Sequence, residues 1–295
     1  MIKIENVSTV GWEPAIRGAR NPMNSWDKSD SWFVEEYSDH GRRFCGHKIT
    51  PGYSNQELFM NPELRELIRA DIEYAYEHAT IRTGGTGCIY IGPNDLKLLT
   101  NLAKAGSDEA KFRRMIVVYL DVTAPMYWWK EADTYKVGTV RDSCSTMHKI
   151  ADKEFTLEDF SWEQLLNNGC DLFELQWGKD CSTKVQPQHF LIQYIIPVLN
   201  ICREKYLETK DKKYWWQMIQ LLPSSYNQRA TLMLNYEVLA NMYHARKNHK
   251  LDEWREFCEW IETLPYAKEL IICPTINDMP ISPLLDPARA SGGDR

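Results

Sequence analysis

Asn235 and Arg246 are the residues whose type and spacing first indicate chemistry. If the segment 225–250 is a helix, both fall on one stripe with Leu239 and Met242, since side chains three and four residues apart share a helix face. A carboxamide and a guanidinium on an apolar stripe are costly to bury unless each finds a partner. That partner is either a group in the core or in a neighbouring subunit, or a ligand with a polar edge. A guanidinium suits such a ligand because its planar fork donates to two carbonyl or phosphate oxygens at once.

Other motifs of reactive sites are missing from the sequence. The glycine-rich turn at 83–87 lacks the spacing that cradles a phosphate at a helix start, so it is interpreted as a connector. Cys45 and His47 have no second pair at a matching spacing, which argues against a zinc site. Neither HExxH nor GxSxG occurs. Generic motifs therefore indicate no reaction and no metal site.

The segment 121–146 reads as a strand, an Ala-Pro pair, a helix and a loop. Aligned from Ala124-Pro125, its last part resembles the signature RHRxxSxNExSxR of the flavin-dependent thymidylate synthases (ThyX-like). Four positions keep the character of the signature, although the last has sulfur in place of oxygen: Lys136, Thr139, Asp142 and Cys144. Four others depart from it: Thr134, Tyr135, Arg141 and Thr146.

A second segment with the same resemblance begins at Leu222-Pro223. Asn235, Asn241 and Arg246 follow it at the family's spacing. Glu237 stands where the family has an arginine, and Ile219 stands where it often has a nucleotide-binding arginine. Together the two segments resemble the family in outline over residues 121–263.

The resemblance implies a mixed α+β fold, with a small N-terminal sheet with helices and a helix-rich C-terminal half. It implies one domain over residues 1–280 and a flexible tail over 281–295. It further implies reductive methylation of a dUMP-type pyrimidine nucleotide by a homotetramer, with FAD as cofactor and methylenetetrahydrofolate and NADPH as co-substrates. The replaced basic residues favour an alternative as well, a non-catalytic homo-oligomer of the same fold that binds a nucleotide or a protein partner.

The resemblance also assigns roles to individual residues. Arg246 is expected to bind the pyrimidine and to polarise it during catalysis. Asp142 and Cys144 are expected to lie on the loop that faces the nucleotide phosphate. Four residues are expected to hold the flavin: Lys136, Thr139, Asn235 and Asn241.

Composition narrows the class of protein. The 295 residues carry a net charge of -6 without a long run of Lys or Arg, so no general nucleic-acid-binding surface is expected. The longest apolar runs are too short to cross a bilayer, and the first residues lack the features of a signal peptide. The eight cysteines form no CxxC pair, so they are expected to be reduced and mostly in the core. These features predict a cytoplasmic protein.

The pattern of apolar residues predicts the elements that position these groups. The segments 88–91 and 115–122 are predicted as strands, and the first sixty residues as short elements and long loops. Asn94 or Asp95 is expected to cap its helix, and Pro125 to open the next one. Helices are predicted over 62–80, 96–104, 125–136, 161–168, 187–209, 212–222, 225–250 and 252–264.

Replacing Arg246 with alanine tests the role assigned to it. We expect the Arg246→Ala protein to fold as before and to lose pyrimidine binding, because no other guanidinium lies on the predicted stripe. Binding of a pyrimidine nucleotide, measured by calorimetry beside a thermal melt, checks this. Undiminished binding would rule out the assigned role.

Overall fold

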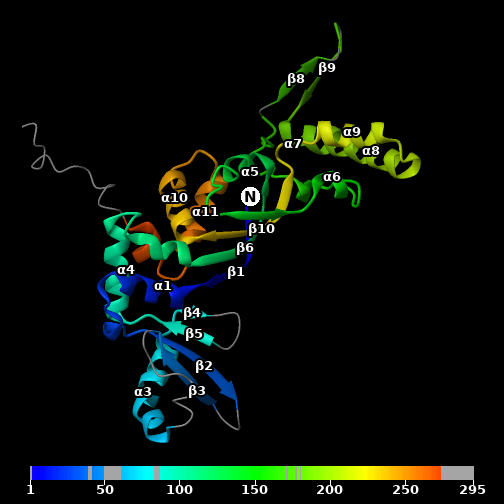
Figure 1. Ribbon diagram of the computed structural model, residues 1–295. Helices are drawn as coiled ribbons and strands as arrows, with labels where there is room; N and C mark the ends of the chain where they lie inside the picture. Colours follow the sequence, from blue (N-terminus) through cyan, green and yellow to red (C-terminus); the bar gives the residue numbers. More distant parts are fainter. Residues whose placement is uncertain are drawn as a thin grey trace, which may run out of the picture. The chain divides into compact units, whose positions relative to one another are not determined.

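The computed structural model describes residues 2–38, 42–49, 61–82, 87–170, 172–176, 178–179 and 181–273 (Figure 1). The chain forms two compact units. The first contains Met1–Val7, Leu120–Leu232 and His249–Phe257, and the second contains Ser8–Tyr119, Met233–Asn248 and Cys258–Arg295. The predicted tail over 281–295 and most of the glycine-rich turn at 83–87 lie outside the described residues.

The second unit contains an antiparallel sheet covered by one long helix. The strand order is β3-β2-β5-β4, with Trp32 of β2 opposite Lys48 of β3 and Tyr90 of β5. Helix α3 packs on this sheet through Ile68, Ile72 and other buried side chains (Figure 1). The bounds are β2 Trp32–Ser38, β3 Arg42–Lys48, α3 Pro62–His78, β4 Ile81–Arg82 and β5 Gly87–Tyr90.

The remaining elements of the second unit are mainly helical. Gly11 precedes α1 with a φ of 86°, and a Cβ there would lie 2.0 Å from the carbonyl oxygen of Met115, so only glycine fits this approach. These helices, with the 3-10 segments η1 to η3 and the π-helical segment η6, are α1 Trp12–Arg20, η1 Asn21–Met23, η2 Trp26–Lys28, α4 Pro93–Ala105, η3 Ala110–Met115, α10 Tyr236–Arg246 and η6 Lys268–Ile272.

A buried carboxylate ties α4 to α1 in the second unit. Asp95 is 1% exposed and accepts hydrogen bonds from Arg20 Nε at 2.8 Å and from the hydroxyls of Ser29 and Ser31 at 2.6 Å. The start of α4 is capped instead by Asp30, whose carboxylate accepts from the backbone N–H groups of Asn94 and Asp95. The expectation that Asn94 or Asp95 caps this helix is therefore wrong.

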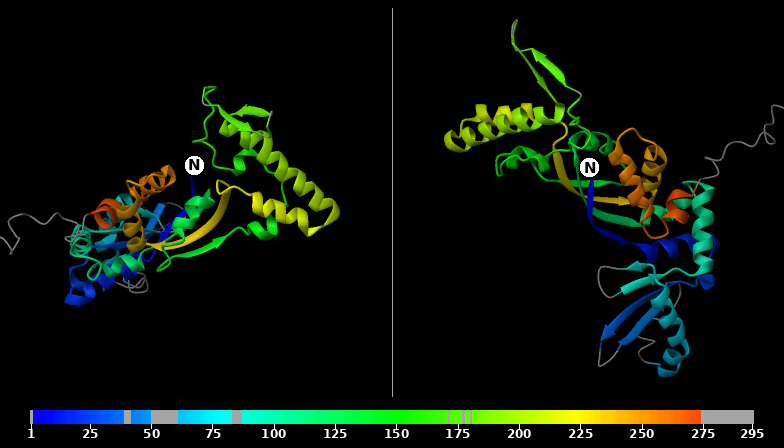
Figure 2. Two further views of the ribbon diagram at one scale, coloured as in Figure 1. Left: turned by 90° about the horizontal axis from the view of Figure 1, so that it is seen from above. Right: turned by 180° about the vertical axis from the view of Figure 1, so that it is seen from behind.

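Most residues of the four-stranded sheet with the order β1-β6-β10-β7 belong to the first unit. Its other elements include an isolated hairpin, β8-β9, and a pair of helices, α8 and α9, that lie side by side (Figure 2). The strands are β1 Lys3–Val10, β6 Val117–Pro125, β7 Val140–Ser143, β8 Phe173–Gln176, β9 Ser182–Val185 and β10 Asn227–Asn235. The helices, with the 3-10 segment η4 and the π-helical segment η5, are α5 Met126–Ala132, α6 Thr146–Lys149, η4 Leu157–Asp159, α7 Pro187–Phe190, η5 Leu191–Ile195, α8 Ile196–Thr209, α9 Lys212–Leu221 and α11 Asp252–Glu262.

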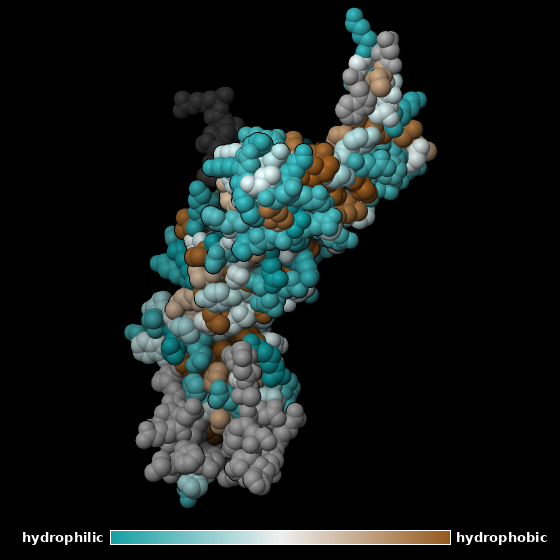
Figure 3. Space-filling view, turned by 90° about the vertical axis from the view of Figure 1, so that its right-hand side faces the viewer, coloured by the Kyte–Doolittle hydropathy of each residue, from teal (hydrophilic) through white to brown (hydrophobic). Residues whose placement is uncertain are grey.

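Two groups of apolar side chains form the interior of the first unit. Trp128 and Trp254 are almost fully buried, with ring centroids 4.8 Å apart, and Phe257 packs against both. The second group includes Phe155, Phe160 and Leu199, between the 150–160 segment and the α8–α9 pair. Apolar side chains of that pair also reach the surface, which is mixed teal and brown in Figure 3.

The mixed α+β class is confirmed, and most predicted elements are present. The helix predicted over 225–250 is wrong, because residues 227–235 form strand β10 and only Tyr236–Arg246 is helical. Ala230, Leu232 and Leu234 are buried while Arg229 and Thr231 are exposed, which is the period of two of a half-buried strand.

Two smaller predictions about the elements and one about the cysteines are also wrong. The segment 161–168 forms turns instead of a helix, and the first sixty residues contain longer strands than expected. The cysteines carry free thiols as predicted, but only three of the eight are buried: Cys88, Cys258 and Cys273. No helix in the described ranges is both long and apolar enough to cross a membrane.

Replacing Asp95 with asparagine is expected to destabilise the second unit by about 3–5 kcal/mol, because Arg20 keeps its buried charge and loses its counter-ion. Chemical denaturation of the purified protein measures this free energy of unfolding. Asp108→Asn, at an exposed position, is the control and should change it by less than about 0.5 kcal/mol. Equal effects of the two substitutions would contradict this account of the buried pair.

Candidate functional site

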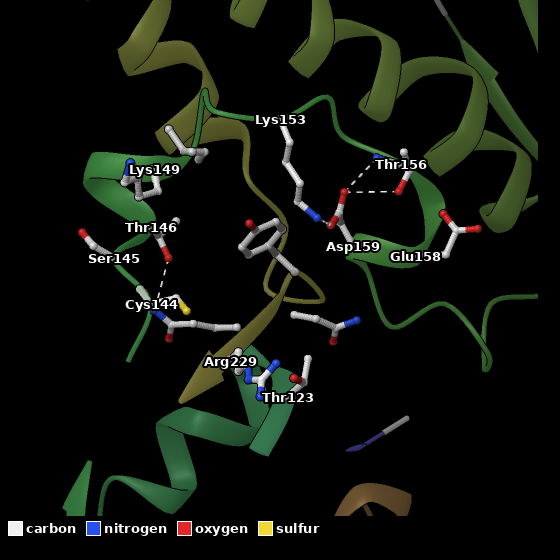
Figure 4. Close-up of a pocket in the computed structure, with 14 residues that line it drawn as sticks. Thr123, Cys144, Ser145, Thr146, Lys149, Lys153, Thr156, Glu158, Asp159 and Arg229 are labelled. Atoms are coloured by element: carbon white, nitrogen blue, oxygen red, sulfur yellow. Dashed lines mark hydrogen bonds and ion pairs between the residues drawn. The ribbon is translucent and has the colours of Figure 1, made fainter. Parts of the chain in front are cut away.

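A pocket of about 450 Å³ opens in the first unit (Figure 4). It is lined by residues of the segments 144–159 and 226–229, together with Thr123 of β6. Cys144, Ser145, Thr146 and Lys149 lie on one side in Figure 4, and Thr156, Glu158 and Asp159 lie on the other.

Pairing of β7 with β10 holds the two lining segments together. The N–H of Cys144 donates to the carbonyl oxygen of Arg229 at 2.9 Å. The side-chain amide of Gln228 donates to the carbonyl oxygen of Cys144 at 2.8 Å and to the hydroxyl of Thr146 at 3.2 Å. Gln228 therefore fixes the backbone of the loop that enters the pocket.

Arg141 locks the same loop from outside the pocket. Its guanidinium binds Asp133 at 2.7 Å, donates to the side-chain oxygen of Gln228, and lies 3.9 Å from the ring centroid of Trp129. An arginine with an ion pair, an amide partner and an aromatic face is held in one place. It is thus a structural group of the loop and is not available to a ligand in this arrangement.

Two lysines line the pocket, and they are paired differently. Lys149 binds Asp152 at 2.8 Å, and both side chains are more than half exposed. Lys153 binds Asp159, whose side chain is 9% exposed. The other oxygen of Asp159 accepts from the N–H of Thr156 at 2.9 Å. The hydrogen bond to Asp159 raises the pKa of Lys153, so this lysine stays charged.

Arg229 is the third cation of the pocket, and Asp121 anchors it. Its guanidinium donates to Asp121 at 2.8 Å, and the same carboxylate accepts from Thr231 at 2.6 Å and from Asn6 at 2.8 Å. These hydrogen bonds, that from Thr231 foremost, hold the pKa of Asp121 far below its usual range. Arg229 is half exposed, so its remaining N–H groups can reach a ligand.

Tyr226 gives the pocket an aromatic residue. Its ring packs against Phe160 and Phe155, with centroids 5.7 Å and 6.3 Å away. Burial raises the pKa of its hydroxyl, and the charge of Asp159 adds to that shift. The pocket therefore combines cations, hydroxyl groups and a fixed aromatic ring, a set that suits a phosphorylated aromatic compound better than a purely apolar one.

The predicted site residues of the first unit have separate environments. Cys144 lines the pocket with an exposed thiol, whereas Asp142 is exposed on β7 and does not line it. Lys136 is exposed, and among the described residues no acid pairs with it. The hydroxyl oxygen of Thr139 is buried and has no hydrogen-bond partner within the described part of the chain.

The other predicted site residues belong to the second unit. Asn235 is the N-cap of α10, where its side-chain oxygen accepts from the N–H of Val238 at 3.0 Å. Its position before the helix corrects the predicted stripe, and the cap explains its carboxamide without a ligand. Asn241 is exposed, and Arg246 is half-buried and interacts with other groups of the chain. None of the three lines the pocket of the first unit, and their binding roles stay predictions.

The pocket residues that follow the signature-like segment 134–146 were not predicted as part of a site. Lys149, Lys153 and Arg229 match no motif, and they come together only because β10 is a strand. The one signal for Asp159 was the spacing of Thr156 and Asp159, which form a capping box at a short 3-10 turn. In the described segments no group of three or more His, Cys, Asp or Glu residues could hold a metal ion.

Comparisons with known proteins agree with this geometry at the level of fold. No protein-family model and no curated protein sequence matches the chain. A solved structure of flavin-dependent thymidylate synthase ThyX from Helicobacter pylori, complexed with FAD and dUMP, matches over 92% of this chain and 100% of its own, at 12% identity and a TM-score of 0.50. This chain has a ThyX-like fold. A second structure of the Helicobacter pylori enzyme with FAD and dUMP covers 92% of this chain and 97% of its own, at 13% identity and a TM-score of 0.46.

Gln228→Ala tests how the pocket loop of this ThyX-like fold is held. Removing the amide takes the side-chain donor from the Cys144 carbonyl oxygen and one acceptor from Arg141, which keeps its ion pair with Asp133, so the free energy of unfolding should fall by about 1–2 kcal/mol. Hydrogen exchange should accelerate over 140–146. Gln217→Ala, on the exposed face of α9, is the control and should change neither quantity. Unchanged exchange in Gln228→Ala would show that another contact fixes the loop.

Proposed function

We propose that this protein binds a dUMP-type pyrimidine nucleotide in the pocket of its first unit and methylates it reductively with FAD as cofactor. The observation that carries the proposal is the polar pocket itself, which Lys149, Lys153 and Arg229 line in a chain with a ThyX-like fold. A nucleotide monophosphate needs cations and hydroxyl groups around its phosphate and a flat surface beside its base. Tyr226 and the hydroxyls of Ser145 and Thr146 supply the rest of that set.

The loop before the pocket offers groups for a flavin. The buried hydroxyl oxygen of Thr139 has no hydrogen-bond partner among the described residues, so it is free to bond a group of a ligand. Lys136 is three residues earlier in the sequence and is exposed, so its ammonium group could form an ion pair with a flavin phosphate. FAD, when bound, supplies the hydride for the reaction, so the protein needs no nucleophile of its own.

The residues of the pocket bind and orient the nucleotide in this proposal. Lys149 and Arg229 offer charged donors to phosphate oxygens, and Thr146, fixed by Gln228, offers a hydroxyl. The half-buried ring of Tyr226, held by Phe155 and Phe160, limits the positions open to the base. Such positioning of a substrate accounts for much of the rate enhancement when the cofactor carries the chemistry.

A second function is favoured by a specific observation on the same loop. Thr134 and Tyr135 are uncharged where the signature has basic residues. The two terminal nitrogens of Arg141 are bound to Asp133 and Gln228, its plane lies on Trp129, and its Nε is buried without a hydrogen-bond partner among the described residues. Each lost charge-assisted contact weakens binding of a polyanion by about 1.5–3 kcal/mol. The alternative is therefore a homo-oligomer that binds a pyrimidine nucleotide without flavin and without turnover.

One set of measurements on the purified protein distinguishes these functions. The catalytic proposal predicts visible flavin absorbance and release of tritium from dUMP labelled at C5, with methylenetetrahydrofolate and NADPH present. A colourless protein that binds dUMP and releases no tritium supports the non-catalytic alternative. Absence of dUMP binding contradicts both.

Alkylation of cysteines locates the bound nucleotide. Cys144 lines the pocket with an exposed thiol, whereas Cys170 is exposed outside it. We expect saturating dUMP to slow alkylation of Cys144 several-fold and to leave Cys170 unchanged, as read by mass spectrometry of peptides. Cys258 is an internal control in both states, because burial raises its pKa to about 12 and keeps it unreactive. Equal rates at Cys144 with and without dUMP would place the nucleotide elsewhere.

A further inference from the structure

The cations of the pocket differ in how firmly their carboxylate partners hold them. The Lys149–Asp152 pair is solvated on both sides, with side chains 72% and 56% exposed. Exposed pairs of this kind are worth little, so Lys149 can exchange Asp152 for another anion at small cost. Its ammonium group is therefore available to a ligand.

Lys153 is not available in the same way. Its own side chain is 70% exposed, but that of its partner Asp159 is only 9% exposed. The second carboxylate oxygen of Asp159 is already bound to the N–H and hydroxyl of Thr156 at the start of a 3-10 turn. Removing the lysine from this carboxylate would leave a buried charge with too few partners. Lys153 therefore stays with Asp159 while a ligand is bound, and the pair as a whole is neutral.

The two sides of the pocket also differ in charge. Glu158 lies on the same side as the neutral Lys153–Asp159 pair in Figure 4, and its carboxylate disfavours a phosphate dianion there. Ser145 and Thr146 lie on the opposite side with Lys149, where hydroxyl donors and a replaceable ion pair favour a phosphate. This separation gives a bound nucleotide one direction in the pocket.

Lys153 keeps N–H donors beyond the one that Asp159 uses. An ammonium group has three donors, and a neutral ion pair offers the others to uncharged acceptors such as the carbonyl oxygens of a pyrimidine. Tyr226 lies close enough to interact electrostatically with Lys153 and Asp159 and also with Cys144 on the opposite side, so its ring can contact a base that reaches the Lys153–Asp159 pair.

We propose that Lys149 binds the phosphate of the nucleotide and that the Lys153–Asp159 pair binds a ring oxygen of the pyrimidine. This assignment rests on the proposed function and names two specificity-determining residues for it. Both lie outside the signature-like segment 134–146, so the chain supplies cations to its ligand from positions that follow that segment.

The test compares dUMP with deoxyuridine, which has the same base and sugar and no phosphate. Lys149→Gln should weaken the affinity for dUMP by about tenfold or more and leave the affinity for deoxyuridine unchanged. Lys153→Gln should weaken both ligands by the same factor. Lys213→Gln is the matched control, because Lys213 pairs with Asp211 at 2.9 Å on the surface of α9 and does not line the pocket. Ligand-detected magnetic resonance and calorimetry measure both affinities.

The dependence of dUMP affinity on ionic strength tests independently which lysine binds the phosphate. The affinity of the wild-type protein for dUMP should fall as salt is raised, and Lys149→Gln should flatten that dependence more than Lys153→Gln does. Thermal melts establish that each variant is folded. If Lys153→Gln does not fold, Lys153→Arg is used instead, because it keeps the pair with Asp159. It should change the affinities for dUMP and deoxyuridine by the same factor.

The outcomes separate this inference from the function on which it rests. A wild-type protein that binds no dUMP contradicts the proposed function. A wild-type protein that binds dUMP, with Lys149→Gln weakening dUMP and deoxyuridine alike, contradicts the assignment of the phosphate. If Lys153→Gln loses binding of dUMP but keeps binding of deoxyuridine, the two lysines have the opposite roles, and the proposed assignment is contradicted as well.

Discussion

Pairing of strand β10 with β7 is the interaction on which the candidate site depends. The hydrogen bond from the Cys144 N–H to the Arg229 carbonyl oxygen joins two segments that are more than eighty residues apart in the sequence. Gln228 reinforces that junction from the same strand. This junction fixes one end of the 144–159 segment, and the contacts of Phe155 and Phe160 with Tyr226 fix the other, so the pocket forms between them.

Each cation of the pocket has a carboxylate partner, and the burial of that carboxylate determines how easily the cation can exchange it for an anionic ligand. Arg229 is anchored by a carboxylate that three donors keep ionised, and Lys153 by a buried one. Only Lys149 has a solvated partner that an anion can replace at little cost. Such a site would favour a ligand with one compact anionic group and an otherwise neutral polar edge, and the proposed pyrimidine nucleotide has both features.

Much of the fold could be predicted from the sequence, because strong local patterns agree with the tertiary structure. The helix at Pro62–His78 and the strand at Val117–Pro125 are examples. Residues 227–235 were predicted as helix because leucine and methionine suit either element, and only pairing with neighbouring strands decides between them. Because of that one error, Asn235 was predicted in the interior of a helix and not at its start. For the same reason Arg229 and Tyr226 were not included in the predicted site. Lys149 and Lys153 could not be found either, since their roles come from spatial partners and not from spacing.

A crystal structure of the protein with dUMP would show directly whether the pocket between the 144–159 segment and the start of β10 binds a nucleotide. The account predicts the phosphate among Ser145, Thr146 and Lys149, with the base toward Tyr226 and Lys153 and the Lys153–Asp159 pair intact. A nucleotide bound at any other place, with this pocket unchanged at saturating dUMP, would contradict it.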